Sequence, residues 1–230
     1  MTYATGFQPS SVAVDDFNND NQLDIVVTNS GENTVSVLLG YGNNSFANQM
    51  TYLTGAYPYS VAVGDFNNDT RLDIVVTNSG GNTVSVLLGY GNGSFPNQMM
   101  YSTGLYPYSV AVGDFNNDTQ LDIVVANYLN NSVSVLLGYG NGSFADQMTS
   151  STGANPCSVA TGNFNNDTQL DIVVPNSGNN TVSILLGYGN GSFANQMTYL
   201  TGYNPVFVAV GDFNDDAQLD IAVTNYDSDS

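Results

Sequence analysis

The chain has 230 residues, of which 42% are hydrophobic, and this is enough for one domain with a substantial core. It carries 20 acidic side chains against a single basic one, Arg71, and no histidine. Because phosphate groups are bound through Lys and Arg, this balance argues against nucleic acid and anionic membranes as partners. No apolar run reaches the roughly 18 residues of a membrane helix, so membrane insertion is not expected.

One motif recurs along the chain with a period of 49 residues. It reads DFNNDNQLD from Asp16, DFNNDTRLD from Asp65, DFNNDTQLD from Asp114, NFNNDTQLD from Asn163 and DFNDDAQLD from Asp212. Self-similarity at a fixed period indicates a repeat architecture and decides the fold before any local pattern does. The chain starts and ends in mid-repeat, and we interpret it as a fragment or processed product.

The unit at residues 50–98 shows the predicted elements in chain order. Strands are expected at residues 50–55, 60–66, 72–78 and 83–90, separated by a proline turn, a polar loop and a glycine turn. No segment has a helical period. The small residues Ala62 and Gly64 indicate that the strand at 60–66 lies where space is tight.

Four short antiparallel strands in 40 to 50 residues are typical of a β-propeller blade. The alternative, an open β-solenoid, usually has shorter and parallel coils. We therefore predict an all-β fold in which residues 1–230 form a single β-propeller of five four-stranded blades, the last incomplete. If residues 2–6 join the last blade, that blade lacks one strand, and its open edge invites pairing.

The polar loop has the composition of a metal site. In residues 65–73, side-chain oxygens fall at loop positions 1, 3, 5 and 9, as Asp65, Asn67, Asp69 and Asp73. The carbonyl oxygen of Arg71, at position 7, can add one more. Hard oxygen ligands in this number suit Ca²⁺, whereas zinc and copper sites need histidine or cysteine.

The acidic residues are concentrated in these loops. All of the 20 lie there except Glu32, Asp146, Asp227 and Asp229. The alternative is that the loops are only solvated turns, because Asp and Asn are common in turns. Three aspartates at a fixed spacing in four of the five copies favour a metal site over solvated turns.

The sequence resembles the FG-GAP and VCBS repeats, which form the blades of integrin α-subunit propellers. The resemblance covers the whole chain, as SVAVGDFNNDxxLDIVV followed by NTVSVLLGYGNGSF. In that family the loop between the first two strands of a blade binds Ca²⁺ through positions 1, 3, 5, 7 and 9. The resemblance therefore implies about one Ca²⁺ per blade, held by Asp16, Asn18, Asp20, Gln22 and Asp24; Asp65, Asn67, Asp69, Arg71 and Asp73; Asp114, Asn116, Asp118, Gln120 and Asp122; Asn163, Asn165, Asp167, Gln169 and Asp171; and Asp212, Asn214, Asp216, Gln218 and Asp220.

Two departures from the family pattern bear on these sites. The family has glycine at positions 4 and 6, where this chain has Asn or Asp and then Asn21, Thr70, Thr119, Thr168 or Ala217. A β-branched threonine is unfavourable at positive φ, so the turn is expected to stay right-handed or to carry strain. Asn163 replaces the first aspartate of the fourth loop, which should make that site the weakest. We expect affinities near the roughly 10⁻⁴ to 10⁻³ M of extracellular modules.

Strand alternation puts the calcium loops and the GYGNGSF turns on one face of the propeller, and the proline and glycine turns on the other. On that other face, aromatic residues vary between units, and the candidate ligand-binding residues are Tyr57, Tyr59, Tyr106 and Tyr108. Exposed tyrosines can stack on sugars or anchor a protein partner. They can equally pack locally around the proline turn.

Sequons in the exposed turns make Asn92, Asn141 and Asn190 the candidate glycosylation sites. Together with calcium loops they favour a secreted, extracellular protein whose signal lies outside this sequence. The single cysteine, Cys157, excludes an intramolecular disulfide.

With no histidine or lysine for acid–base or Schiff-base chemistry, the chain is not expected to be an enzyme. The first interpretation is a calcium-stabilised binding or adhesion module. The alternatives are a lectin of the same fold and a structural unit that self-associates through the incomplete blade.

Overall fold

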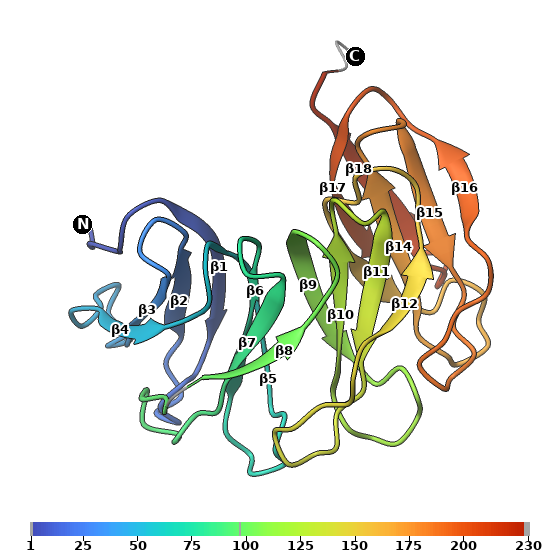
Figure 1. The fold of residues 1–230 in the computed structure, drawn as a ribbon. Coiled ribbons are helices and arrows are strands. Elements are labelled where there is room, and N and C mark those ends of the chain that lie inside the picture. The colour runs from blue at the N-terminus through green and yellow to red at the C-terminus, as the bar shows by residue number, and fades with distance from the viewer. Residues whose placement is uncertain (1, 97, 228–230) are drawn as a thin grey trace.

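The structure, a computed structural model, describes residues 2–96 and 98–227, and these form strands and loops without any helix (Figure 1). Accordingly, the described residues contain no helix that could span a membrane. The strands in chain order are Pro9–Asp15 (β1), Asp24–Asn29 (β2), Thr34–Leu38 (β3), Met50–Leu53 (β4), Pro58–Gly64 (β5), Asp73–Asn78 (β6), Thr83–Leu87 (β7), Met99–Ser102 (β8), Pro107–Gly113 (β9), Asp122–Asn127 (β10), Ser132–Leu136 (β11), Met148–Ser151 (β12), Ala160–Gly162 (β13), Asp171–Asn176 (β14), Thr181–Leu185 (β15), Met197–Leu200 (β16), Pro205–Gly211 (β17) and Asp220–Asn225 (β18).

The strands form five antiparallel sheets in sequence order. Four have four strands each, β1–β4, β5–β8, β9–β12 and β13–β16, and the fifth has only β17 and β18. We refer to them as blades 1 to 5. The predicted all-β propeller with an incomplete last blade is confirmed.

The core lies between consecutive blades, and this explains the sequence of the second strand. β6 reads DIVVTN and is buried along its whole length. Ile74 and Val76 pack against blade 1, in a cluster that includes Val26, whereas Val75 packs against blade 3. A strand buried on both faces must be apolar at successive positions, so it lacks the alternation of a half-exposed strand.

The first strands of neighbouring blades, β1, β5, β9, β13 and β17, pack side by side. Space is tight there, as Ala62 and Gly64 predicted. A Cβ atom on Gly64 would lie 2.5 Å from Cδ1 of Leu121 in the next blade. Cys157, which occupies the place of Ser10, is buried there and donates a hydrogen bond from Sγ to the carbonyl oxygen of Pro205 (3.1 Å).

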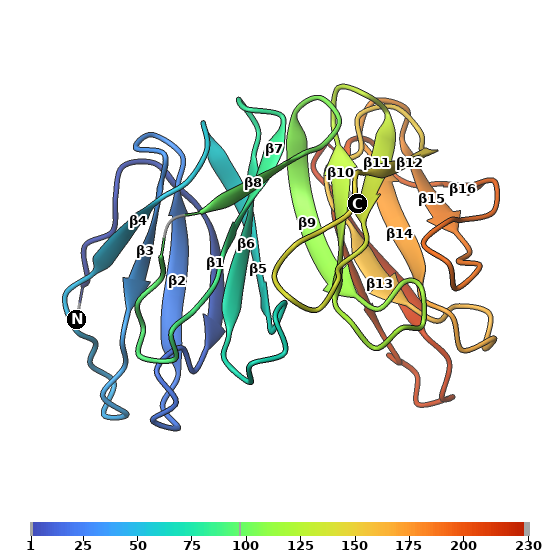
Figure 2. The same ribbon diagram turned by 60° about the horizontal axis from the view of Figure 1, so that its bottom comes forward.

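The five blades form an open arc (Figures 1 and 2), and in the described part of the chain blade 5 does not pack on blade 1 as neighbours do. The expectation that residues 2–6 join the last blade is wrong. Tyr3 packs edge-on against Phe46 of blade 1 (centroids 5.4 Å apart), as Tyr52 packs against Phe95 (5.3 Å). The N-terminal segment therefore takes the place of a preceding blade's fourth strand. Blade 5 is left two strands short, with an open edge at β18.

Candidate calcium loops and tyrosine patch

Each predicted metal loop connects the first two strands of its blade. The loop lies on the same face as the long connection between the third and fourth strands of the blade, as expected. Residues of the two segments are joined by hydrogen bonds. For example, Gly89 N donates to Oδ1 of Asp73 (2.7 Å), the last residue of the second loop.

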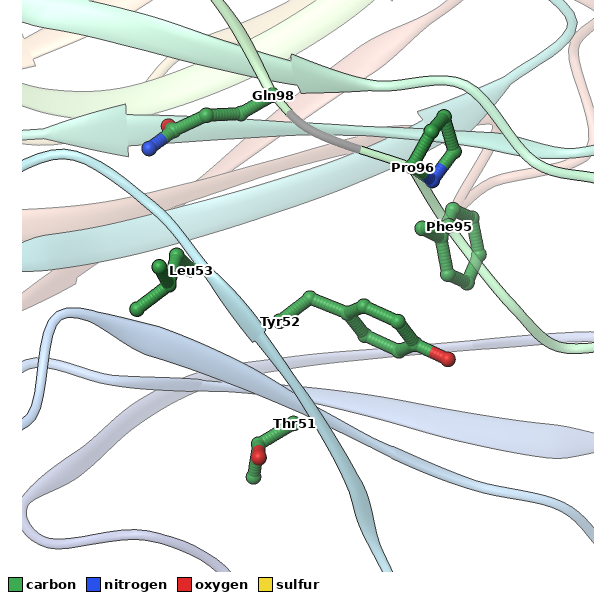
Figure 3. Close-up of a pocket in the computed structure, with 6 residues that line it drawn as sticks. All are labelled: Thr51, Tyr52, Leu53, Phe95, Pro96 and Gln98. Carbon is green, nitrogen blue, oxygen red and sulfur yellow. The ribbon is translucent and has the colours of Figure 1, made fainter.

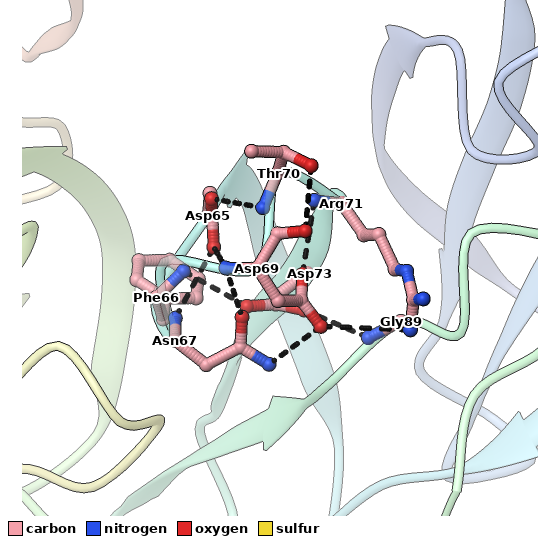
Figure 4. Close-up of polar contacts among 8 residues, drawn as sticks. All are labelled: Asp65, Phe66, Asn67, Asp69, Thr70, Arg71, Asp73 and Gly89. Carbon is pink, nitrogen blue, oxygen red and sulfur yellow. Dashed lines mark hydrogen bonds and ion pairs between the residues drawn. The ribbon is translucent and has the colours of Figure 1, made fainter.

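The first aspartate of the second loop, Asp65, accepts hydrogen bonds from several backbone N–H groups of that loop (Figure 4). Oδ1 of Asp65 accepts from the N–H of Asn67 (3.3 Å) and of Asp69 (3.1 Å), and Oδ2 accepts from Thr70 (2.7 Å). Oδ1 of Asp69 then accepts from the N–H of Arg71 (3.0 Å). The carboxylates thus point into the loop and fix its path.

Positions 4 and 6 of every loop have a left-handed backbone. The φ angles at position 6 are +66° for Thr70, +69° for Thr119 and +72° for Thr168, and position 4 ranges from +57° to +62°. These are the two positions where the family has glycine. Of the two sequence-based alternatives, the structure shows strain: three threonines adopt a conformation that L-residues with a branched Cβ disfavour.

In the first four loops the aspartate at position 9 is fully buried and anchors the loop to its blade. Besides the bond from Gly89, Asp73 accepts the N–H of Phe66 on Oδ2 (2.8 Å). Burial raises the pKa of Asp73 to about 6, although the two backbone hydrogen bonds act to lower it. Asp122 has the same bonds, and burial likewise raises its pKa to about 6.

The fourth and fifth loops are less complete than the others. Oδ1 of Asn163 accepts the N–H of Asp167 (3.1 Å), but in the described residues no bond to Thr168 N is found, because an amide has one acceptor oxygen. In blade 5, Asp220 accepts the N–H of Phe213 (3.0 Å), and the strands that would supply the second donor are absent from that sheet.

The donor set of the loops fits Ca²⁺ in its chemistry. In the described residues, however, no three Asp, Glu, Cys or His side chains converge as they would around a metal ion. The loop carboxylates instead accept backbone N–H groups. Each carboxylate oxygen has two acceptor sites, so an oxygen with one N–H partner can still ligate a hard cation.

The opposite face carries an aromatic cluster, which we call the tyrosine patch: Tyr59, Tyr106, Tyr108 and Tyr128. The hydroxyl groups of Tyr59 and Tyr108 are hydrogen-bonded, and their ring centroids are 4.1 Å apart. Tyr128 lies 5.6 Å from Tyr108 and 6.0 Å from Tyr106. A pocket of about 260 Å³ is lined by Tyr106, Tyr108, Tyr128 and Leu129.

The patch differs from the sequence-based set at two residues. Tyr57 is not part of it, because its ring packs over Gly80 in the turn of its own blade. Tyr128 was missed, although a signal was present. Tyr128 and Leu129 replace the Ser-Gly pair found at residues 30–31, 79–80 and 177–178.

The sequence matches the family described as FG-GAP-like repeat at residues 16–76, 65–125, 116–174 and 164–223. The chain belongs to the FG-GAP-like repeat family. A search of curated proteins found no match.

Solved structures similar to these FG-GAP-like repeats share the fold at low identity. They include BBS1N in complex with ARL6DN, soaked with mercury (TM-score 0.65, 14% identity, covering 95% of this chain and 64% of that one). A streptogramin B lyase has a TM-score of 0.64 at 15% identity, covering 97% and 70%. A putative 6-phosphogluconolactonase from Bacteroides fragilis has a TM-score of 0.65 at 14% identity, covering 96% and 62%. The chain spans 59% of the length of the first BBS1N structure, and the likeness shows the fold alone.

Neighbouring FG-GAP-like loops are linked by side chains. The amide group of Asn68, at position 4, donates to Oε1 of Gln120, at position 7 of the next loop, and Asn117 bonds Gln169 in the same way. At Gln120 and Gln169 the side chain at position 7 is therefore used between loops, which leaves the backbone carbonyl of these residues as their contribution to a metal site.

The three candidate sequons lie in exposed turns of the FG-GAP-like repeats. In each, the asparagine Oδ1 accepts a hydrogen bond from the hydroxyl of the serine two residues later, at 2.5 Å for Asn92 and 2.6 Å for Asn141 and Asn190. All three side chains are on the calcium-loop face.

Grooves also open between neighbouring blades. One of about 410 Å³ lies beside β4, lined by Thr51, Tyr52, Leu53, Phe95, Pro96 and Gln98 (Figure 3). The Tyr52 hydroxyl is not free for a ligand, because it donates to the carbonyl oxygen of Gly93 (3.1 Å). Similar grooves between later blades indicate a feature of the repeat, not a specific site.

Proposed function

We propose that the chain is a calcium-stabilised extracellular propeller that binds a protein partner on the face of the tyrosine patch. The observation that carries the calcium proposal is the left-handed backbone at positions 4 and 6 of all five loops. Threonine disfavours that conformation at three of these positions, and strained backbone of this kind is typical of sites that hold a ligand.

Bound Ca²⁺ would supply positive charge where carboxylates gather. The chain has a formal net charge of −19, and nearly all its acidic groups are in the loops. The residues that would hold the ion are those at positions 1, 3 and 5 and the carbonyl at position 7. Asp73, at position 9, orients the loop through the N–H group that each of its oxygens accepts, and each oxygen keeps one acceptor site for the ion. A ligand that binds only the folded state raises its stability.

The test is a calorimetric melt in chelator, in Ca²⁺ and in Mg²⁺. We expect Ca²⁺ to raise Tm more than Mg²⁺, and Asp69→Asn with Asp118→Asn to reduce the increase. Asp146→Asn is the matched control, because Asp146 is exposed and outside the loops. A Tm unchanged by Ca²⁺ would refute the proposal.

Protein binding is supported by the crystal structure of BBS1N, a propeller of similar fold, in complex with ARL6DN. On this chain the tyrosine patch offers aromatic area with hydroxyl groups, a composition enriched at interfaces. Changing Tyr106 and Tyr128 to alanine should abolish capture of the partner, while Tyr90→Ala, exposed on the opposite face, should not.

A lectin is the second candidate, favoured by the pocket of about 260 Å³ between the tyrosine rings. Sugar rings stack on aromatic faces, and the open side of Tyr106 is accessible. Binding to a glycan array that disappears in Tyr106→Ala but persists in Tyr90→Ala would support it. The remaining alternative is a structural unit that self-associates through the incomplete blade.

We also propose secretion with glycosylation at Asn92, Asn141 and Asn190, and no enzymatic activity. Expression through a eukaryotic secretory pathway should give a mass that falls on treatment with an N-glycosidase. Changing the three asparagines to glutamine should remove that difference. A wild-type mass unaffected by the glycosidase would contradict this part of the proposal.

A further inference from the structure

The outer faces of blades 1 and 5, at the two ends of the described arc, expose apolar side chains. On blade 1, Val12 is 59% exposed and Leu23 65%, although Val61, the counterpart of Val12, is 8% exposed. On blade 5, Phe213 is 61% exposed and its counterpart Phe66 only 1%. Exposed apolar patches of this kind mark interaction sites.

The inner junctions are built from the same apolar contacts, which are complete between blades 2 and 3 and between blades 3 and 4. Between blades 1 and 2, Asp15 takes the place of the glycine, and between blades 4 and 5 Phe164 has no partner ring among the described residues. A leucine from the following blade fills the space above a glycine of the preceding one, as Leu121 does at Gly64 and Leu170 at Gly113. Beside it, two phenylalanines meet edge-on, as in the pair Phe66–Phe144, whose centroids are 5.6 Å apart.

Hydrogen bonds accompany the apolar contacts at these junctions. At the junction of blades 2 and 3, the N–H of Gly142 donates to the carbonyl oxygen of Phe66 (2.9 Å), and Gly93 and Gly191 do the same for Phe17 and Phe115 (2.9 Å each). The loops are joined by the bond from Asn68 to Gln120.

The ends of the arc hold the two unmatched halves of this junction. The three atoms nearest to a Cβ built on Gly211 all belong to Phe213 of the same blade, whereas at Gly64 and Gly113 the nearest atom belongs to a leucine of the next blade. The backbone at Asn44 has a φ of +64°, close to the +78° of its counterpart Gly93. The two residues therefore have a similar backbone conformation. Blade 5 contributes Gly211, Phe213 and Asp215, and blade 1 contributes the matching Leu23, Phe46, Asn44 and Gln22.

The N-terminal segment does not cover the blade 1 face. Tyr3 contacts Phe46 as Tyr52 contacts Phe95, at the rim of the blade, while Val12, Val14 and Leu23 stay exposed. The place filled is that of a preceding blade's fourth strand. The place of that blade's first two strands remains open, and β17 and β18 are strands of this type.

We propose that blade 5 of one copy packs on blade 1 of a second copy, head to tail, reproducing the inner blade junction. Leu23 fills the space above Gly211, Phe213 meets Phe46, and the Gln22 amide donates to Asp215. Because the two surfaces differ, the interface is heterologous and generates a ring or an open chain of copies. This deepens the self-association alternative, using the blade faces and leaving the β18 edge unpaired, and it requires neither calcium nor the tyrosine patch.

The test exploits that asymmetry. Leu23→Glu blocks only the blade 1 face and Phe213→Glu only the blade 5 face, and both side chains are exposed, so both variants should fold. In sedimentation velocity, wild-type protein should associate as its concentration rises, and each variant alone should stay monomeric. A mixture of the two should form a dimer and nothing larger, since one intact face of each kind remains.

Met100→Glu is the control, because Met100 is exposed on β8 of blade 2 and the substitution should leave association unchanged. Circular dichroism and melts of each variant check that the fold is retained. Wild-type protein that stays monomeric at all concentrations overturns the proposal. So does a single variant that still self-associates, or a mixture that does not. The melt in Ca²⁺ is independent of these outcomes, so the two proposals fail separately.

Discussion

At the scale of single residues, the loops combine an unfavourable backbone with side chains that fix it. Thr70, Thr119 and Thr168 occupy left-handed positions, and the aspartate at position 1 holds the loop by accepting N–H groups, including that of Thr119 (2.8 Å). The local conformation is therefore set by hydrogen bonds and not by the preference of the threonine itself.

Thr119→Gly should stabilise the protein. Relief of a left-handed β-branched residue gains about 1–2 kcal/mol, and the greater freedom of glycine in the unfolded chain offsets about 0.4–1 kcal/mol of it. We expect a net increase of roughly 0.5–1 kcal/mol in the free energy of unfolding, measured by urea denaturation in chelator. Thr149→Gly is the control: in the extended strand β12 it should destabilise. If Thr119→Gly destabilises as well, the position is not strained.

The buried aspartates should make the metal-free protein more stable in mild acid. Asp122 has a pKa of about 6 in the folded protein, above its value of 3.8 in the unfolded chain. Its contribution to the free energy of unfolding is therefore fully present below pH 3.8 and is lost as the pH rises through 6. In chelator we therefore expect Tm to increase from pH 7 to pH 5.

Lower net charge also stabilises in acid, so variants must separate the two causes. Asp122→Asn cannot titrate and should reduce the slope of the Tm profile between pH 5 and 7, while lowering Tm overall. Part of the slope should remain, because Asp73 still titrates with a pKa of about 6. Asp146→Asn removes a charge from the surface and should keep the wild-type slope. If Asp122→Asn also keeps that slope, the burial of Asp122 does not drive the effect.

At the scale of elements, the second strand of each complete blade is protected on both edges. β10 pairs with β9 and β11, whereas β18 pairs only with β17. The stability of a region follows its packing and pairing, so it should vary along the arc.

Amides of β17 and β18 should exchange with solvent faster than those of β9 and β10. The measurement is hydrogen exchange by mass spectrometry at a concentration where the protein is monomeric. Because the two strand pairs have nearly the same sequence, composition is controlled within one molecule. Equal protection of both pairs would show that blade 5 is as firmly held as blade 3.

At the scale of the whole molecule, all but four of the 20 acidic side chains lie in loops on one face, and the formal net charge is −19. Like charges in neighbouring loops repel, and at about 0.1 M salt the screening length is roughly 10 Å. Adding NaCl in chelator should therefore raise Tm, and the increase should be smaller in Ca²⁺. Repeating the series with KCl checks that ionic strength, and not the particular ion, is responsible. A Tm that is constant or falls with salt would exclude repulsion as a limit on stability.

The fold and the loop positions could be predicted because the 49-residue period repeats every signal. Features that depend on an end or on a single unit could not. The period does not say whether Tyr3 belongs to blade 5 or to the rim of blade 1, and three-dimensional packing on Phe46 decides it. Likewise, Asp73 matches a ligand pattern, but its burial and its two backbone partners appear only once blades are assembled. Tyr128 shows that departures from the repeat deserve as much weight as the repeat.

The chain has a single thiol, and its position turns it into a reporter. Cys157 is buried, burial raises its pKa to about 11, and its sulfur bonds Pro205 across the junction of blades 4 and 5. Cys157 is only 6% exposed, so opening of that junction should increase its rate of reaction with a maleimide. A change in the rate of labelling of the native protein therefore reports on detachment of the last blade, with one signal per molecule and no mutation.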